Sequence, residues 1–450
     1  MSIPVPYLLS LCAAVFADTS AIELRYKGSL EQVSRQEANA EVKQFEVYCL
    51  LQEQAGQAKL AFLVDERGSG WAWPERFGEI TLNEKYQPVG KTQIRVLHTH
   101  EGTPYPLDLR QPMFDQADKL AADAEWSNGT QRYQVIRTLK RGNRTCWEVD
   151  VFTNIGKRQT VWVEEDTGLV VAAKTKVTMG RGDQFELLME LESVNEIKPD
   201  KLAALQKPLG GLLKLQQTLK RRENATKPEL SKEQLAATAA VLESLTIDAT
   251  DTPFRSQVSA IARDLKLQTR RDDDVEVLAK RIIGKEAPEF ALEDLNGKKI
   301  DSKELDNSIV VLHFWKYHDN PLTEPYGQVA YLDFLHNKRS KLGVSVLGIA
   351  VDPRTDKTNE VSQAKRDFRK FRDFMNLSYP IALNSGTLLK TLGDPREVEA
   401  ALPLWVVIDH TGKVVHYKSG YYEIHPEKGL EELDNVVIPL IRQRRAEGTN

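Results

Sequence analysis

Polar and apolar side chains alternate over several short stretches in the first half of the chain. The alternation is seen in 43–49 (KQFEVYC), 133–136 (YQVI), 146–152 (CWEVDVF) and 159–163 (QTVWV). A period of two is typical of strands with one buried face. Gly168, in the EDTG turn between 159–163 and 169–172, suits the positive φ that a hairpin turn often needs. We therefore predict an antiparallel β-rich domain over residues 22–198.

The pattern changes to a helical one over residues 199–283, where Ala, Leu, Lys, Glu and Gln dominate. Ser231 and Gln234 have the spacing of a capping box, in which each side chain bonds the other residue's backbone N–H. Thr252 followed by Pro253 marks a second helix start, because proline at the first helical position sacrifices no hydrogen bond. These signals predict a helical connector.

Strands and helices alternate in the last third of the chain, residues 284–446. The apolar runs 309–314 (IVVLHF) and 344–351 (VSVLGIAV) predict central strands that are covered on both faces. Segments 328–338 and 360–374 read as helices, and 404–417 as a hairpin. This order predicts an α/β domain.

The first seventeen residues, MSIPVPYLLSLCAAVFA, are apolar and end in a small residue before Asp18. The stretch is short for a transmembrane helix and resembles a signal peptide, although it lacks the usual basic residue near its start. A buried terminal element is the alternative. We expect an exported protein, periplasmic or extracellular, with no transmembrane segment after cleavage. In an oxidising compartment Cys49 and Cys146 could then form a disulfide or remain two buried thiols.

Charge and motifs exclude several classes of function. The formal net charge is −4, which argues against a nucleic-acid binder. The sequence contains no P-loop, dinucleotide fingerprint, nucleophile elbow or zinc-binding cysteine spacing, so we expect no cofactor. His98 and His100 share one strand face, as two metal ligands would, but a solvated pair is favoured and we predict no metal.

The last third of the chain resembles the thioredoxin-fold redoxins of the thiol-disulfide oxidoreductase and AhpC/TSA type. The resemblance rests on ordered motifs: 284–290 (GKEAPEF), 292–298 (LEDLNGK), 309–315 (IVVLHFW), 347–352 (LGIAVD), and Leu402-Pro403 before 404–409. It implies a thioredoxin-like domain with a cis proline at Pro403. It also implies that the active-site loop follows Trp315.

The family's two active-site cysteines are missing. Asp319 and Leu322 occupy the Cys-x-x-Cys positions, and no cysteine follows Cys146. Disulfide exchange needs a thiolate nucleophile and a second thiol that resolves the mixed disulfide. A carboxylate and an alkyl group supply neither. We therefore expect a redox-inactive domain that keeps its shape, with Trp315, His318, Asp319 and Pro403 as candidate binding residues.

Residues 146–151 and 160–169 of the β-rich region are similar to a hairpin of periplasmic lipoprotein-carrier half-barrels, a resemblance that implies an apolar concavity. The leading hypothesis is an exported protein that binds a protein or an apolar, lipid-like ligand in the cell envelope. A thiol-disulfide oxidoreductase or peroxiredoxin-like enzyme using Cys49 and Cys146 is the first alternative. A structural envelope protein is the second.

Overall fold

The computed structural model describes residues 21–33, 39–54, 57–68, 70–219, 230–316, 328–383, 386–422, 424 and 427–447. The chain divides into two compact units, residues 1–266 and 267–450. A large antiparallel sheet, a helical segment and an α/β domain follow one another along the chain, which confirms the predicted fold class.

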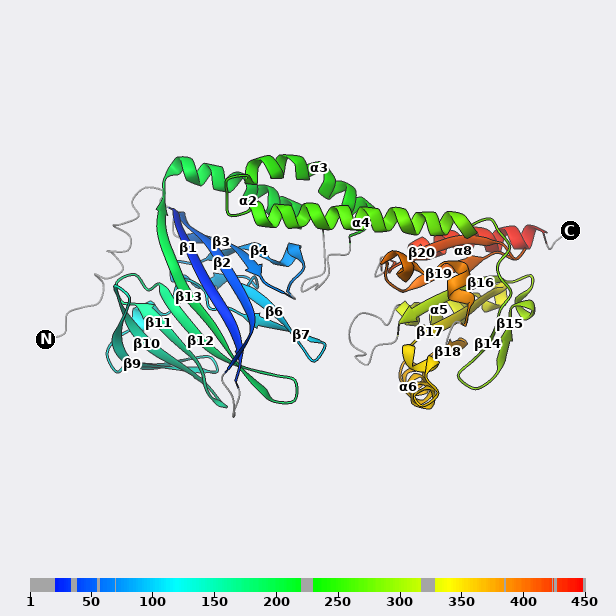
Figure 1. Ribbon diagram of the computed structural model, residues 1–450, viewed down its shortest axis with the longest axis horizontal. Helices are drawn as coiled ribbons and strands as arrows, with labels where there is room; N and C mark the ends of the chain where they lie inside the picture. The colour runs from blue at the N-terminus through cyan, green and yellow to red at the C-terminus, as the bar shows by residue number, and fades with distance from the viewer. Residues whose placement is uncertain are drawn as a thin grey trace. The chain divides into compact units, whose positions relative to one another are not determined.

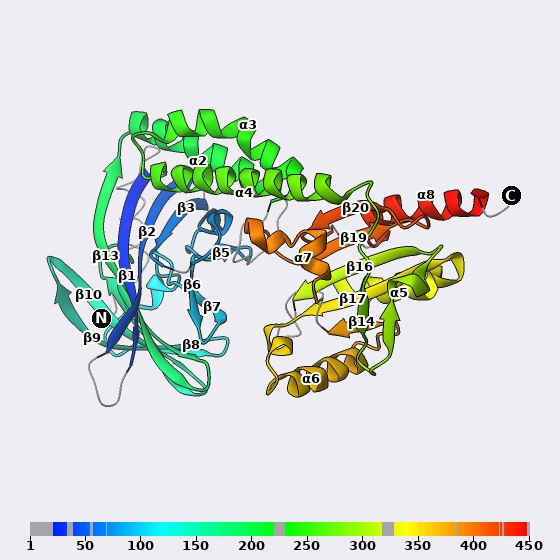
Figure 2. The ribbon, with the colours of Figure 1, turned by 45° about the vertical axis from the view of Figure 1, so that its right-hand side comes forward.

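The first unit is built on an 11-stranded sheet in the order β5-β4-β3-β2-β1-β13-β12-β11-β10-β9-β8. Its strands are β1 (Ala21–Gln32), β2 (Ala40–Gln54), β3 (Gln57–Glu66), β4 (Phe77–Leu82), β5 (Pro88–Val89), β8 (Glu125–Asn128), β9 (Gln131–Arg141), β10 (Arg144–Thr153), β11 (Gly156–Glu164), β12 (Val170–Met179) and β13 (Asp183–Ile197). Neighbouring strands pair antiparallel, and β1 pairs with β13 from Ala21↔Ile197 to Gln32↔Phe185. The sheet is strongly curved (Figures 1 and 2).

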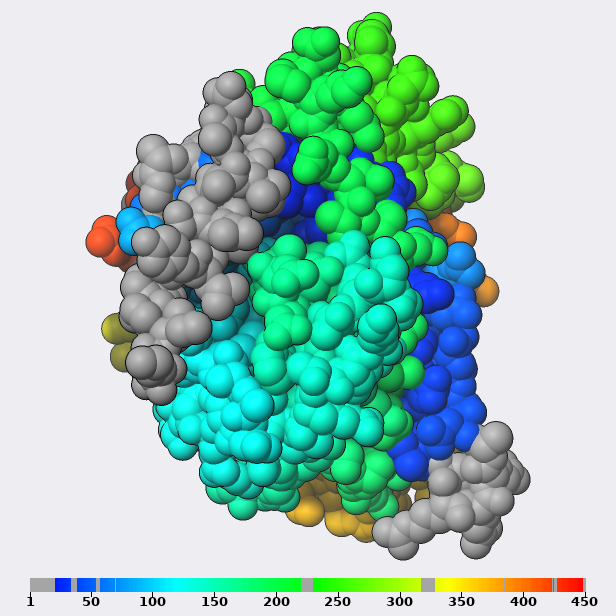
Figure 3. All heavy atoms as spheres, turned by 90° about the vertical axis from the view of Figure 1, so that its left-hand side faces the viewer, coloured from blue at the N-terminus to red at the C-terminus, as the bar shows by residue number. Residues whose placement is uncertain are grey.

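One face of this sheet carries the main hydrophobic core. Inward residues of nearly every strand join one cluster, to which the separate hairpin of β6 (Arg95–His100) and β7 (Thr103–Asp108) contributes Val96 and Leu107. The concave side is therefore partly filled by the chain's own hairpin. Figure 3 shows the outer surface of the unit, with the cyan and green side chains of the later strands beside the blue ones of the first strands.

The opposite face of β1 to β4 packs against the helical segment. Helices α2 (Pro199–Leu219) and α3 (Lys232–Ala249) and the first part of α4 (Arg255–Ile282) bury a second cluster with Leu50, Leu63 and Phe77. The predicted capping box is confirmed, because Ser231 Oγ accepts from Gln234 N and Gln234 Oε1 accepts from Ser231 N.

The second unit has a 5-stranded mixed sheet in the order β18-β17-β16-β19-β20. Its strands are β16 (Ile309–Lys316), β17 (Val344–Val351), β18 (Ile381–Leu383), β19 (Leu404–Ile408) and β20 (Val414–Ser419), preceded by the hairpin β14 (Ala291–Glu293) and β15 (Lys299–Asp301). Apolar residues of α5 (Val329–Arg339), α6 (Val361–Phe374) and α8 (Glu431–Glu447) join one core cluster, and those of α7 (Leu388–Leu392) and the end of α4 join the other. Both faces of the sheet are thus covered.

Candidate functional site

The end of β16 and the start of β19 lie side by side in the second unit. Leu404 is the antiparallel partner of Phe314, so the register brings Pro403 next to the end of β16. The Leu402–Pro403 peptide bond is cis, as the resemblance implied. The residues that follow β16, including His318, Asp319 and Leu322, lie outside the described residues.

Trp315 and Pro403 are both buried. The Trp315 indole is 1% exposed and packs against Phe368 and Phe371, with ring centroids 5.7 and 5.4 Å away. The Pro403 carbonyl accepts a hydrogen bond from Gly420 N at 2.7 Å. The ring contacts of Trp315 belong to the core of this unit.

A buried aromatic cluster supports this end of the sheet. Trp405 lies between His313 and Tyr422, with ring centroids 4.0 and 4.9 Å away. Gln328, just before α5, is bonded to Tyr422 twice: its Nε2 donates to the Tyr422 carbonyl at 2.7 Å, and its Oε1 accepts from Tyr422 N at 3.0 Å. These contacts fix Gln328, the first described residue after the gap that follows β16, against the core of the unit.

His416 and Tyr422 are two titratable side chains in contact within this cluster. The His416 Nε2 lies 2.7 Å from the Tyr422 hydroxyl. Burial lowers the pKa of His416, and the positive charge of Lys418 lowers it further. Burial also raises the pKa of Tyr422. Both shifts favour the neutral forms, so at pH 7 the contact is a hydrogen bond between a neutral imidazole and a neutral phenol.

Of the two alternatives for Cys49 and Cys146, a disulfide or two buried thiols, the structure has the second, because both thiols are free and buried. Cys49 lies on β2 and Cys146 on β10, and strands β1, β13, β12 and β11 separate them in the sheet. Neighbouring strands are about 4.8 Å apart, whereas the Cα atoms of a disulfide lie within roughly 7 Å. The sequence could not reveal this separation, since it depends on the order of the strands.

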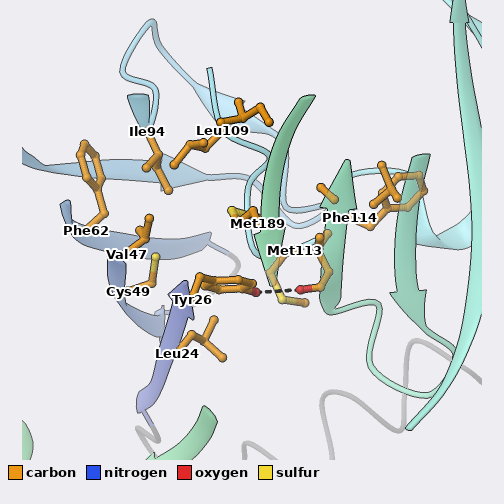
Figure 4. Close-up of a cluster of buried hydrophobic side chains, with 14 of the residues drawn as sticks. Leu24, Tyr26, Val47, Cys49, Phe62, Ile94, Leu109, Met113, Phe114 and Met189 are labelled. Atoms are coloured by element: carbon orange, nitrogen blue, oxygen red, sulfur yellow. Dashed lines mark hydrogen bonds between the residues drawn. The ribbon is translucent and has the colours of Figure 1, made fainter. Parts of the chain in front are cut away.

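Neither thiol is placed for nucleophilic chemistry. Cys49 lies in the core beside Val47 and Tyr26 (Figure 4), and burial raises its pKa far above the ordinary value. In the same view the Tyr26 hydroxyl donates to the Val170 carbonyl at 2.9 Å. Burial also raises the pKa of Cys146, and the nearby Glu164 adds to the rise. A thiol with a raised pKa holds little thiolate at pH 7 and reacts slowly.

We expect Cys49 and Cys146 to resist alkylation by iodoacetamide in the native protein and to react fully in denaturant without reductant. Peptide mapping by mass spectrometry measures the modification at each site. A disulfide-linked peptide pair, or rapid labelling of either thiol in the native state, would contradict this arrangement.

A pocket of about 430 Å³ opens on the concave side of the first unit, between the β6–β7 hairpin and the later strands. Its apolar lining comes from Pro106, Leu107, Leu109, Val151, Val177 and Leu187, and its polar lining from Gln93, Asp108, Arg110, Gln131, Arg158, Gln159 and Thr175. The volume lies in the range of small-molecule sites.

Within the described ranges, some of the charged side chains around this pocket form ion pairs and one does not. Arg110 pairs with Asp115 at 2.5 Å, and Asp108 pairs with Arg95 at 2.7 Å. Arg158 is half-buried and has no acidic partner among the residues that the structure describes. The half-barrel resemblance implied an apolar concavity in this unit but named none of the lining residues, because the lining is assembled from strands far apart in the chain.

None of the helices in the described ranges is both long enough and apolar enough to span a membrane.

Comparison with known proteins identifies the family that the second unit resembles. Residues 283–417 match the model of the AhpC/TSA family. The thiol-disulfide oxidoreductase ResA of Bacillus thuringiensis subsp. konkukian is 32% identical over 153 residues, which are 34% of this chain and 75% of that protein. ResA of one Bacillus cereus strain is 35% identical over 133 residues, 30% of this chain and 67% of that protein.

Among solved structures, a putative thiol:disulfide interchange protein DsbE from Chlorobium tepidum matches with 22% identity and a TM-score of 0.28. The match covers 35% of this chain and 97% of that one. The family match falls on the unit that holds the cis proline and the mixed sheet. Through this C-terminal thioredoxin-fold redoxin domain, the chain belongs to the AhpC/TSA and thiol-disulfide oxidoreductase family.

Proposed function

We propose that this protein is a redox-inactive member of its family, exported through its first seventeen residues, that binds an amphiphilic ligand in the β-rich unit. The proposal that the domain is redox-inactive is supported by the absence of any cysteine after Cys146 in the sequence. The redoxin domain therefore has no sulfur nucleophile of its own. The ResA proteins are named for an activity that requires one.

Cys49 and Cys146 do not replace the missing pair. Both are buried on strands of the other unit, and the pKa of each is raised. Redox-active cysteines are instead found at accessible, electropositive positions that lower the thiol pKa. This contrast supports a binding role over the enzymatic alternative.

The pocket of the first unit supports a ligand with an apolar body and an anionic group. Five aliphatic side chains line it, and they would cover a hydrocarbon segment. Arg158 offers a guanidinium that no described acid neutralises, and such a group binds a carboxylate or phosphate through charge-assisted hydrogen bonds. A fatty acid or another anionic lipid has this combination. The docking of a protein partner near Pro403 stays a separate prediction.

Ligand binding can be tested with a dansyl-labelled undecanoic acid, followed by fluorescence titration. We expect Arg158→Ala to weaken binding by at least about tenfold, since a hydrogen bond to a charged group contributes roughly 1.5–3 kcal/mol. Lys176→Ala is the matched control. Lys176 is an exposed base on β12 between the pocket residues Thr175 and Val177, and alternation along the strand turns it to the other face.

Equal affinity of the wild type and Arg158→Ala would contradict the assigned orientation of the ligand. Loss of affinity in the Lys176→Ala control to the same extent would indicate non-specific attraction to positive charge. Extraction of the purified native protein with organic solvent, followed by mass spectrometry, would identify a bound lipid directly.

A further inference from the structure

Two hairpin tips meet at one edge of the first unit. His100 ends β6 and Glu101 begins the turn to β7, while Asp183 begins β13 just after the turn from β12. The hairpins are far apart in the sequence, but the Tyr105 hydroxyl on β7 accepts a hydrogen bond from Gly180 N in the other turn at 3.0 Å. This bond holds the two tips together.

The meeting point brings together three metal-ligating side chains. One ligand atom each of His100, Glu101 and Asp183 lie within 4.8 Å of one another. His100 Nε2 is 2.7 Å from Asp183 Oδ2. Two donors that share a tetrahedral Zn²⁺ at about 2.1 Å are separated by roughly 3.4 Å. A small separation of His100 from Asp183 would therefore accommodate an ion between them.

The surrounding residues hold the imidazole in place. The Phe185 ring, which is buried, packs edge-on against His100 with centroids 5.1 Å apart. Gly180 has a φ of +58°, and a Cβ at this position would lie 3.0 Å from the His100 ring and 3.3 Å from the Glu101 carboxylate. A glycine here leaves room for both ligands. The His100 side chain is 16% exposed and that of Asp183 is 45% exposed. The site therefore packs against the core on the His100 side and is open to solvent on the Asp183 side.

We propose that His100, Glu101 and Asp183 form a binding site for Zn²⁺. One imidazole and two carboxylates suit this borderline dication better than Mg²⁺ or Ca²⁺, which favour all-oxygen ligand sets. Three protein ligands leave a fourth position for water. The ion would cross-link the hairpin that fills the concave side to the turn between β12 and β13. This inference is independent of the proposed ligand and of the redox chemistry.

The test uses the untagged full-length protein and Zn²⁺ alone, with isothermal titration calorimetry. We expect one Zn²⁺ per chain at this site, and loss of binding by at least tenfold in His100→Gln and in Asp183→Asn. Glu101→Gln changes only an exposed turn residue and should weaken binding without affecting the fold. Substitution with Co²⁺ gives a second readout, because its visible absorption reports an inner-sphere imidazole and should disappear in His100→Gln.

His98→Gln is the matched control. His98 lies on the same strand, with its ring 6.3 Å from that of His100, but it is not one of the three ligands. We expect its Zn²⁺ affinity to remain close to that of the wild type. Absence of Zn²⁺ binding by the wild type, unchanged binding by His100→Gln, or an equal loss in His98→Gln would each overturn the site.

Discussion

Glu66→Ala is expected to destabilise the β-rich unit by about 3–5 kcal/mol, because it removes the counter-ion of a buried charge. Lys43 Nζ lies 2.9 Å from Glu66 Oε2, and the two side chains are 2% and 0% exposed. Glu66 also accepts from the backbone N–H groups of Trp71 at 2.9 Å and Leu97 at 2.8 Å. One carboxylate thus joins β2, β3, the following loop and the β6–β7 hairpin.

Hydrogen exchange measured by mass spectrometry, peptide by peptide in increasing urea, isolates the stability of this unit within the full chain. Glu79→Ala is the control, because the Lys59–Glu79 pair is 43% and 30% exposed and such pairs contribute roughly 0–1 kcal/mol. Glu66→Gln keeps an acceptor oxygen and should therefore destabilise the unit less than Glu66→Ala does.

The double substitution Lys43→Met with Glu66→Leu should recover part of the stability that Glu66→Ala loses, because it leaves no unpaired buried charge. A loss in Glu66→Ala no larger than that of the Glu79→Ala control would contradict the role assigned to this ion pair.

Local signals in the sequence predicted the elements of the fold well. The apolar run 344–351 coincides with β17, and the segment 360–374 differs from α6 by one residue. The Ser231 capping box forms as its spacing predicted. Each of these features depends on contacts between residues close together in the chain, so a single sequence contains the information.

Features set by distant contacts could not be predicted. The pairing of β1 with β13 closes a loop that includes most of the first unit, and no local pattern specifies it. The same topology separates Cys49 from Cys146 and brings Asp183 to His100. The buried Lys43–Glu66 pair was missed for this reason too, because an alternating strand pattern gives no sign that two charged residues face the core.

At the candidate redoxin site, one predicted feature is confirmed and others lie outside the described residues. The cis Pro403 next to the end of β16 followed from ordered motifs that the family match supports. The positions of His318, Asp319 and Leu322 rest on the sequence alone. Substitutions at these positions, read out by activity, therefore test the site most directly.

Restoring the two thiols is expected to create disulfide-exchange activity. In Asp319→Cys with Leu322→Cys, the first thiolate would attack a substrate disulfide, and the second thiol would resolve the mixed disulfide and release the reduced substrate. We expect a rate more than about tenfold above that of the wild type, since the unmodified domain has no nucleophile for either step. Asp319→Cys alone, mixed with the substrate in the absence of dithiothreitol, should trap a mixed disulfide, because no second thiol is present to resolve it.

The most direct test is the reduction of insulin disulfides by the full chain with dithiothreitol as the electron donor, comparing the wild type with the double variant. We expect the wild type to stay at the uncatalysed rate and the double variant to exceed it. Turnover by the wild type would contradict the loss of redox chemistry, and an inactive but folded double variant would contradict the placement of Asp319 and Leu322 at the family's dithiol positions.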